Sequence, residues 1–202
     1  VEKKKRNKKT AKNEPKNKKK ILQCGGGNFL RAFADWMIDI YNEKNRTDLG
    51  ILVVKTTREG DYEAWSNQEG LYHVLTRGIQ NGNLVDECHL VKCISHILHV
   101  YKSWEIFLNS AENENLRYLF SNTTEMGIRF SVDDKKTATP PREFPAKLTL
   151  WLYRRYRHFK GSNEKGCIFF PLELIPNNGE MLRICILQNA DNWHLENGFK
   201  NW

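Results

Sequence analysis

The chain has 202 residues, of which 40% are hydrophobic, and a formal net charge of +8. This length suits one sizeable domain with its own core, and no apolar stretch approaches the roughly 18–20 residues that cross a bilayer. The charged N-terminal segment lacks the apolar run of a secretory signal, so we expect neither a membrane protein nor a secreted one.

The net charge is concentrated in residues 1–20, which hold ten lysines and Arg6 against two glutamates. That segment carries +9, so the other residues together carry −1. Residues 1–19 have too few apolar side chains to offset the entropy of ordering, and we expect a disordered, lysine-rich tail. Such a tail could bind RNA, DNA or another anionic surface through phosphates, but we favour a solvated extension without a partner. No basic helix with interleaved aromatic residues supports nucleic acid as a partner.

The cysteines are odd in number and scattered along the chain, which is typical of reduced thiols and not of a disulfide framework. The five are Cys24, Cys88, Cys93, Cys167 and Cys185. Because reduced thiols persist in the cytoplasm, we expect a cytoplasmic protein.

Three glycines mark the start of the folded part, which we place at residues 20–202. An apolar run ends at Leu22, and Gly25, Gly26 and Gly27 follow it closely. With no Cβ, Gly25 allows a tight turn and Gly27 allows a pyrophosphate to approach the backbone. The free N–H groups of a following helix would then hold the phosphates. This G-x-G spacing is a weak signal alone, because triple glycines also occur in loops without a ligand.

The residues after the glycines predict a βαβ unit, although Leu30 stands where the dinucleotide fingerprint has its third glycine. Apolar residues recur at spacings of three and four, which predicts an amphipathic helix. They are Phe29, Leu30, Phe33, Met37, Ile38 and Tyr41. Residues 50–54 are apolar and partly β-branched, as in a strand buried on both faces of a parallel sheet. A strand, glycine turn, helix and second strand in about 35 residues strengthen the dinucleotide hypothesis.

The rest of the chain continues the alternation of strands and helices. Strand patterns cover 71–76, 116–120 and 167–170, and the last of these is predicted as a buried strand. Helix patterns cover 62–67, 104–111, 147–159 and 179–193, polar turns are expected at 55–60, 78–82 and 121–125, and 131–145 is predicted as a loop. Residues 84–97 are ambiguous between strand and helix. The alternation predicts an α/β fold with a doubly wound, mostly parallel sheet that binds ligands at the carboxyl ends of its strands.

Several separated segments together resemble one known family. The glycine segment and residues 70–74, 77–80, 121–130, 144–149 and 171–180 are similar to the amino-terminal domain of the mannitol dehydrogenase family, and within it to the tagaturonate reductase (altronate oxidoreductase) branch. The resemblance runs from about Ile21 to Trp202. It implies a Rossmann-like NAD-binding domain of an enzyme that moves hydride between a nicotinamide cofactor and a hexonate, interconverting altronate and tagaturonate.

The resemblance also implies a partner domain. Family members continue into a largely helical domain that carries a catalytic lysine with a nearby asparagine and histidine, and we expect those residues beyond Trp202. No catalytic residue is therefore assigned in this chain, which by itself should show little or no turnover. A longer product that contains the chain should be the enzyme. The alternative is a non-catalytic nucleotide-binding module, or a truncated remnant, whose basic tail docks on an anionic partner.

The expected cofactor contacts lie in the glycine segment and after the strand at 116–120. Beside Phe29 and Arg31, the glycines match the family's variant G-x-G-x-F-x-R, in which the third glycine is not expected. Asn122 and Thr123 follow a central strand, where an amide and a hydroxyl can reach the nicotinamide ribose. The predicted cofactor-binding residues are Ile21, Leu22, Gln23, Cys24, Gly25, Gly26, Gly27, Asn28, Phe29, Leu30, Arg31, Ala32, Asn122 and Thr123.

The expected cofactor is NAD, which the resemblance implies, with NADP as the alternative. Dinucleotide enzymes often place an acid after the second strand to bind the adenosine ribose, whereas this chain has Lys55 with Arg58 nearby. These cations could favour a 2′-phosphate, unless Lys55 is a solvated strand end. Two more residues depart from the family: Cys24, which we expect to be a buried and not a reactive thiol, and Gly26, which should loosen the turn.

A run of cysteines and histidines invites a zinc interpretation. It comprises Cys88, His89, Cys93, His96 and His99. Structural zinc sites usually have paired ligands at C-x2–4-C spacing, and this run has only one such pair, a C-x4-C, in a segment filled with apolar residues. We therefore predict no metal site.

Two further residues in the matched segments carry weaker hypotheses. His73 could approach the cofactor or substrate, but we favour a hydrogen-bonded strand histidine. Lys147 lies at a predicted helix start and could contact a sugar-acid carboxylate. We favour a solvent-facing or helix-packing lysine at that position.

Overall fold

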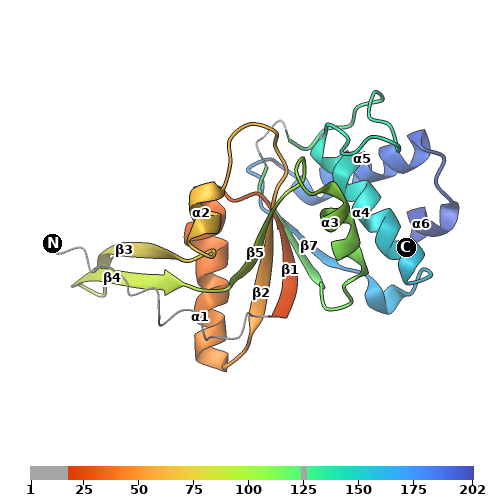
Figure 1. Cartoon of the computed structure of the whole chain (residues 1–202). Coiled ribbons are helices and arrows are strands. Elements are labelled where there is room, and N and C mark those ends of the chain that lie inside the picture. Colours follow the sequence, from red (N-terminus) through yellow and green to blue (C-terminus); the bar gives the residue numbers. More distant parts are fainter. Residues whose placement is uncertain (1–17, 124–126) are drawn as a thin grey trace.

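The computed structural model describes residues 18–123 and 127–202, and its centre is a five-stranded sheet (Figure 1). The strand order is β5-β2-β1-β6-β7, and every neighbouring pair is parallel. The strands are β1 (Lys18–Cys24), β2 (Leu49–Lys55), β5 (Ile94–His99), β6 (Tyr118–Ser121) and β7 (Ile168–Pro171). This is the order of the doubly wound, Rossmann-like fold, and it confirms the predicted fold class.

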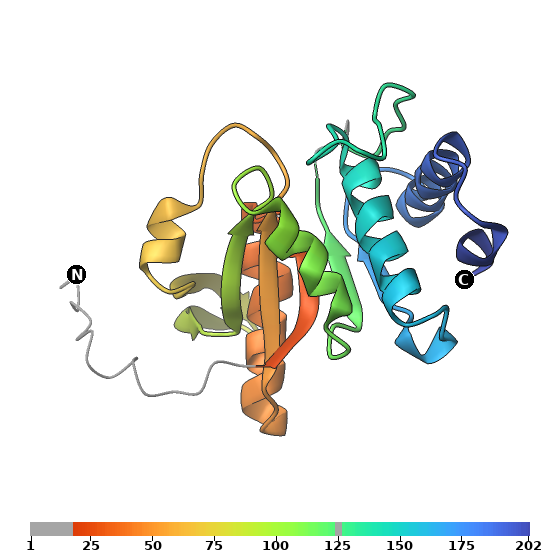
Figure 2. The same ribbon diagram turned by 45° about the vertical axis from the view of Figure 1, so that its right-hand side comes forward.

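Helices cover both faces of this sheet, as Figures 1 and 2 show. The π-helical segment η1 runs directly into α1 on one face, and α3, α4 and α5 lie on the other. The helices are η1 (Leu30–Asp35), α1 (Trp36–Asn45), α2 (Glu63–Asn67), α3 (Trp104–Asn109), η2 (Ser110–Glu112), α4 (Phe144–His158), η3 (Asn163–Lys165), α5 (Asn178–Asn192) and α6 (Asn197–Asn201). The helices predicted around 62–67, 104–111, 147–159 and 179–193 are all present.

The central strands each contain an apolar run because both of their faces are buried. Leu22 of β1 joins the larger core with residues of α3, α4 and α5. Its neighbour Ile21 points to the opposite face and joins the smaller core with Ile51, Val53 and Trp65. Successive side chains of a strand alternate between its faces, so a strand between two helical layers needs a continuous apolar run.

The topology creates a crevice above β1. Cys24 ends β1 level with Val54 of β2 on one side and Ser121 of β6 on the other. The chain goes from β1 to β2 through a helix on one face, whereas α4 lies on the other face after β6. Ligands of open α/β sheets bind where this reversal occurs, outside the carboxyl ends of the strands.

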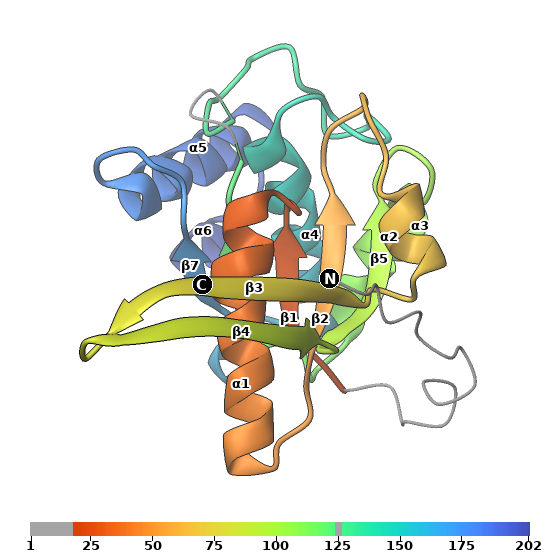
Figure 3. The ribbon, with the colours of Figure 1, turned by 90° about the vertical axis from the view of Figure 1, so that its left-hand side faces the viewer.

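A hairpin stands outside the main sheet and settles the ambiguous segment at 84–97. β3 (Tyr72–Gln80) and β4 (Asn83–Val91) pair in antiparallel fashion, and β5 follows. The hairpin turn occupies only 81–82, so the turn predicted at 78–82 was too long. Figure 3 shows the hairpin crossing in front of α1.

The helix after the glycines buries a different face from the one that its pattern predicted. Asp35, Asp39 and Asn42 are buried, whereas most of the apolar stripe is nearly half exposed. The exposed members are Phe29 (46%), Phe33 (49%), Met37 (48%) and Tyr41 (48%). Hydrogen bonds from the β4 side stabilise the polar face: Asp39 pairs with His89 and accepts a hydrogen bond from the backbone N–H of Lys92, both at 2.8 Å. Apolar periodicity therefore predicted the helix but not its orientation.

The position of β7 in the sheet and the start of β1 also differ from the predictions. β7, predicted as a buried strand, forms an edge of the sheet, and its Ile168 and Phe170 are 54% and 44% exposed. β1 begins at Lys18, before the expected domain boundary at residue 20. Residues 1–17 of the predicted tail, and 124–126 of the predicted turn, lie outside the described residues.

None of the helices in the described residues has both the length and the hydropathy that a membrane crossing requires.

Candidate functional site

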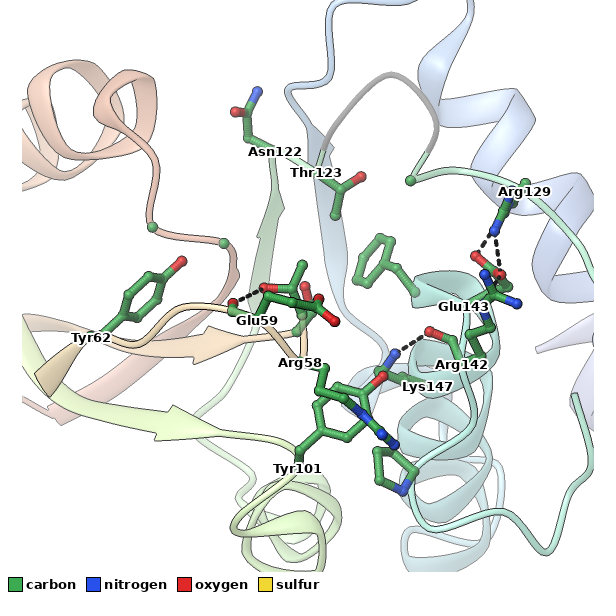
Figure 4. Close-up of a pocket in the computed structure, with 17 residues that line it drawn as sticks. Arg58, Glu59, Tyr62, Tyr101, Asn122, Thr123, Arg129, Arg142, Glu143 and Lys147 are labelled. Atoms are coloured by element: carbon green, nitrogen blue, oxygen red, sulfur yellow. Dashed lines mark hydrogen bonds and ion pairs between the residues drawn. The ribbon is translucent and has the colours of Figure 1, made fainter.

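A cleft of about 730 Å³ opens at the carboxyl ends of β1, β2 and β6 (Figure 4). Gly25 and Gly26 of the glycine turn lie on one wall with the loop that follows β2. Thr123, after β6, and Lys147, in the first turn of α4, lie on the other wall. The cleft is therefore at the edge of the sheet where the sequence predicted a ligand.

The glycine turn has the geometry that the sequence predicted for Gly25. Its φ is +119°, and its N–H donates to the carbonyl oxygen of Val54 at 3.0 Å. A Cβ on Gly25 would lie 3.0 Å from the backbone oxygen of Asn122, so both conformation and space require glycine. Gly27 is exposed, and a Cβ there would meet no protein atom within 4 Å.

Gly26 does not loosen the turn, contrary to expectation. It is buried, and a Cβ on it would lie 2.8 Å from Cζ of Tyr62 and 2.9 Å from Cζ3 of Trp65. A Cβ essentially never lies this close to another carbon atom, so a larger residue at this position would require both rings to move. Gly26 is thus needed for the packing of α2 against the turn.

The helix after the turn starts without a side-chain cap. Its first turn has no acidic residue, and no side chain in the described part of the chain caps it. The N–H of Arg31 donates to the carbonyl of Gly27 at 3.1 Å, while Oδ1 of Asn28 accepts from Nη2 of Arg31 at 2.6 Å. The first N–H groups of a helix have no partners within it, and together with the positive end of the helix dipole they favour an anion.

Four predicted contact residues belong to β1 and face the interior. Ile21, Leu22, Gln23 and Cys24 are all buried, so their part in binding would be to position the turn. Burial raises the pKa of the Cys24 thiol to about 12, which agrees with the expected buried thiol and excludes a thiolate at neutral pH.

The other predicted residues of the glycine segment, and His73, are distributed over several surfaces. Leu30 is buried and would lie 3.2 Å from a Cβ on Gly25, whereas Phe29 and Ala32 are exposed on the helix. Arg31 is half-buried and lines a smaller cavity beside Gly26. His73 is exposed on β3 and lies outside the cleft lining.

A buried polar cluster lies beneath the glycine turn. Nε2 of Gln23 donates to the carbonyl of Gly25 at 3.3 Å and to Oδ2 of Asp35 at 3.5 Å. The hydroxyl of Tyr72 lies 3.0 Å from the same carboxylate oxygen and 2.9 Å from the carbonyl oxygen of Arg31, and its single proton is shared between these two acceptors. Burial raises the pKa of Asp35 to about 7. The carboxyl group of Asp35 is thereby connected to the backbone of Gly25 through Gln23, and to the backbone of Arg31 through Tyr72.

Lys55 shapes the loop after β2 and is not the solvated strand end that the sequence left open. It is buried, and its ammonium donates to the carbonyl oxygens of Thr57 and Glu59 at 2.9 and 2.5 Å and to the Thr57 hydroxyl at 2.5 Å. Burial also lowers its pKa. Three hydrogen bonds use all three of its donors. Arg58, by contrast, is exposed and stacks over the Tyr101 ring, 5.2 Å from the centroid.

Asn122 and Thr123 line the cleft, but they have structural partners that the sequence did not reveal. Nδ2 of Asn122 donates to the carbonyl of Leu172 at 2.5 Å. The N–H and hydroxyl of Thr123 donate to Oε1 of Glu173 at 3.0 and 3.1 Å, and the Ser121 hydroxyl donates to its other oxygen at 3.1 Å. Sequence reasoning missed Glu173, which lies in a matched segment and could have been found there as a buried acid.

Lys147 is not solvent-facing but is a buried lysine of α4 that also lines the cleft. It is 2% exposed, donates to the carbonyl of Arg142 at 2.5 Å and lies 5.2 Å from the centroid of the Tyr101 ring. Burial lowers the pKa of Lys147 to about 8, so its ammonium loses a proton more readily than that of a free lysine. In Figure 4 Lys147 and Arg58 approach Tyr101 from the two sides of the cleft.

Carboxylates occupy the start of α4, and the sequence analysis did not anticipate them. Asp134 accepts hydrogen bonds from the backbone N–H groups of Arg142 and Glu143 at 2.5 and 2.9 Å. Glu143 in turn accepts a bidentate pair from Arg129, with both distances 2.8 Å. This hydrogen bonding lowers the pKa of Glu143, which therefore remains ionised.

The cysteine–histidine run is spread over β4 and β5 and does not form one cluster. His89 pairs with Asp39, and Cys93 is buried beneath the helix. Within the described residues, one trio has potential ligand atoms within 4.8 Å of one another: Asp39, Glu43 and His89. A hydrogen bond and an ion pair account for this trio: His89 is bonded to Asp39, and Glu43 lies 3.5 Å from the ammonium of Lys92.

Residues 19–202 match the family model described as the mannitol dehydrogenase Rossmann domain. Altronate oxidoreductase of Yersinia pestis is 41% identical to the chain over 184 residues, and that of Escherichia coli O7:K1 is 40% identical. These alignments cover 91% of this chain but 38% of each relative, so the chain spans well under half of the relatives' length.

Solved structures of two enzymes have the same fold. A D-sorbitol dehydrogenase in substrate-free form superposes with a TM-score of 0.76 and 18% identity, covering 93% of this chain and 40% of that one. Pseudomonas fluorescens mannitol 2-dehydrogenase, in a ternary complex with NAD and D-mannitol, has a TM-score of 0.73 and 18% identity. It covers 92% of this chain and 39% of that one.

Proposed function

This chain belongs to the mannitol dehydrogenase family, and on that basis we propose that its cleft binds NAD. We further propose that the chain is the cofactor-binding part of an oxidoreductase that interconverts D-altronate and D-tagaturonate. The first proposal depends on the glycine turn, and the second on similarity to altronate oxidoreductases.

The single observation that carries the cofactor proposal is the uncapped helix start behind Gly25. The turn positions the helix N-terminus at the carboxyl end of β1, at the mouth of the cleft. Since no acidic side chain occupies that end, a pyrophosphate can accept hydrogen bonds from the free N–H groups. The exposed, unobstructed backbone at Gly27 allows it to come close.

The loop after β2 supports NAD over NADP. In this fold the adenosine ribose lies beside that loop, where a free cation would favour a 2′-phosphate. The Lys55 ammonium has no donor left for a phosphate, because Thr57 and Glu59 use all three. Arg58 is the remaining cation of this loop, and binding of NADPH as tight as that of NADH would assign it to a 2′-phosphate.

The opposite wall would receive the nicotinamide and the substrate. Thr123 lies at the end of β6, on the side of β1 opposite to the adenosine loop. The substrate class is the finer proposal: a hexonate carries a carboxylate, and Lys147 offers a buried cation at this wall. In the oxidation direction, hydride would pass from the substrate's CH–OH carbon to the nicotinamide, and the hydroxyl proton would pass to a base.

No described residue of this chain is assigned as that base. The family resemblance places the catalytic lysine in a helical domain outside the part of the relatives that the chain spans, and we propose that domain as its partner. NAD supplies the hydride acceptor, and this chain positions it. A cytoplasmic location agrees with the scattered free cysteines.

Two measurements test the proposal separately. Thermal unfolding of the chain should shift upward with NADH and less with NADPH, because a ligand that binds only the folded state stabilises it. No shift at about 100 times the expected dissociation constant would exclude the cofactor site. A polypeptide that also contains the proposed partner domain should then form NADH from D-altronate and NAD faster than from D-mannitol. A stabilising shift without altronate oxidation would support a non-catalytic nucleotide-binding module.

A further inference from the structure

The outer face of the β3–β4 hairpin carries large apolar side chains that no described residue covers. Residues directly opposite in the ladder share a face, and four such pairs make up this outer face. The pairs are Ile79–Leu84, Arg77–Asp86, Leu75–Cys88 and His73–Leu90. Ile79 is 79% exposed, Leu84 84% and Leu75 60%. These are among the most exposed large apolar residues of the described chain.

The opposite face of the hairpin is already in use. Val74 and Val91 pack on the smaller core, and His89 pairs with Asp39 of α1. Figure 1 places the hairpin on the side of α1 away from the sheet, so its outer face points away from the body of the molecule. A two-stranded ribbon is marginally stable alone, and an apolar face of this kind is typical of an interface.

The charges on the outer face select its partner. Nε of Arg77 lies 3.0 Å from Oδ1 of Asp86, and both side chains are more than 60% exposed, at 68% and 61%. The face thus has a basic residue on one strand and an acidic residue directly opposite on the other, between two apolar pairs. A surface with this arrangement is complementary to itself, since turning it over about the ribbon axis exchanges the two strands.

We propose that the outer face of the hairpin is a homodimer contact, in which it stacks on the same face of a second copy about a two-fold axis parallel to the strands. This operation places Arg77 over Asp86 of the second copy and Ile79 over Leu84 of the second copy. It also brings Leu75 over Cys88 of the second copy. The apolar pairs of both copies are then shielded from water. The four charged side chains, Arg77 and Asp86 of each copy, alternate in sign.

This contact is independent of the cofactor site. The outer face shares no residue with the cleft lining, and it lies beyond α1 from the sheet. Two copies can therefore associate while both clefts stay open. The other candidate occupant, a further part of a longer polypeptide, would leave this chain monomeric when it is studied alone.

Sedimentation velocity of the chain as it stands tests the proposal. The wild type should form dimers as its concentration rises, and Ile79→Asp should weaken the dimer at least about tenfold. Leu174→Asp is the matched control, because Leu174 is 89% exposed and lies after β7, away from the hairpin. Circular dichroism confirms that each variant is folded. A wild type that stays monomeric up to about 100 μM, or a control that dissociates equally, would overturn the proposal.

Charge exchange tests the predicted geometry. Arg77→Glu and Asp86→Arg each bring like charges together in the homodimer, and each variant alone should be monomeric. An equimolar mixture should associate, because one variant then presents two negative charges to two positive charges of the other. Alkylation of Cys88 gives an independent readout: it should slow as the wild-type dimer forms. A mixture that remains monomeric contradicts this face-to-face arrangement.

Discussion

Two helices direct their N-termini at the same cleft from opposite faces of the sheet, and they differ in what occupies those ends. Neither helix has an acidic residue in its first turn or a side-chain cap, but carboxylates stand directly before α4. At the start of α4, Asp134 accepts the N–H groups of Arg142 and Glu143, and Glu143 itself is ionised. Both ends carry the positive charge of a helix dipole, but the N-terminus of α4 already lies beside two carboxylates.

This difference identifies the phosphate end of the cleft. An incoming pyrophosphate would meet free N–H groups at the glycine turn and carboxylates at α4. This would fix the orientation of a bound dinucleotide. Its pyrophosphate would lie against the glycine turn, and its nicotinamide, with the substrate, would lie near Lys147 of α4.

The two helices also differ in what they bury. α4 buries Phe144, Leu148 and Trp151, as its apolar pattern predicts. The helix after the glycines buries Asp35 and Asp39 instead. The glycine helix thus buries carboxylic acids, whereas the charged residues that α4 buries are the cations Lys147 and Arg155.

The largest effect that follows from this contrast is a pH dependence of stability. The pKa of Asp35 is raised to about 7, above its unfolded value, so the folded state holds the proton more tightly. Its stabilising contribution is complete below the unfolded pKa and is lost as the pH rises through 7, by roughly 4 kcal/mol in total. Asp35→Asn keeps an acceptor for Tyr72 and removes the buried charge, so it should abolish this slope. Urea unfolding of both proteins between about pH 4 and pH 8 measures it, and parallel curves would show that Asp35 ionises freely.

The second effect concerns the turn itself. Gly25→Ala places a Cβ at a φ of +119° and 3.0 Å from the oxygen of Asn122. The free energy of unfolding should fall by roughly 1–3 kcal/mol from backbone strain alone, and NADH binding should be lost with the turn. Gly179→Ala in α5 is the control, because its Cβ would make an ordinary 3.5 Å contact with Pro171. Equal stability of the two variants would mean that the turn tolerates a side chain.

The smallest effect comes from a carboxylate placed near the N-terminus of the glycine helix, where α4 has Glu143. Ala32→Glu adds an acid to the exposed first turn, which should weaken NADH binding by about fivefold and should leave the helix itself slightly more stable. Ala32→Gln is the matched neutral control and should bind like the wild type. The difference should shrink in high salt, because exposed charges are screened. Identical affinities of the two variants would place the phosphates elsewhere.

The sequence predicted the sheet well because its signals are local. A glycine turn between an apolar strand and a helical pattern occurs within a few residues, and the parallel order follows from the alternation of elements. The edge position of β7 was not predictable in this way, because Ile168 and Phe170 read as apolar whether or not a layer covers them.

The site was predictable only where backbone conformation decides. Gly25 has the predicted conformation. The hydrogen bonds of Lys55 and Glu173, by contrast, are made to backbone carbonyl, backbone N–H and hydroxyl groups that only the folded chain brings near these side chains. The buried face of the glycine helix was mistaken for the same reason: the partners of Asp39, His89 and the N–H of Lys92, lie some fifty residues away in the chain. Long-range polar pairing leaves no periodic trace in a sequence.

Calorimetric titration of NADH into the wild type and into Gly27→Ala tests the central claim most directly. A methyl group at this position would meet no protein atom within 4 Å, so the unfolding midpoint should not change. A pyrophosphate held against the glycine turn would meet it, and the dissociation constant should rise at least about tenfold, or 1.4 kcal/mol. NADH that binds both proteins equally, or neither, would contradict the assignment of the glycine turn as the phosphate site.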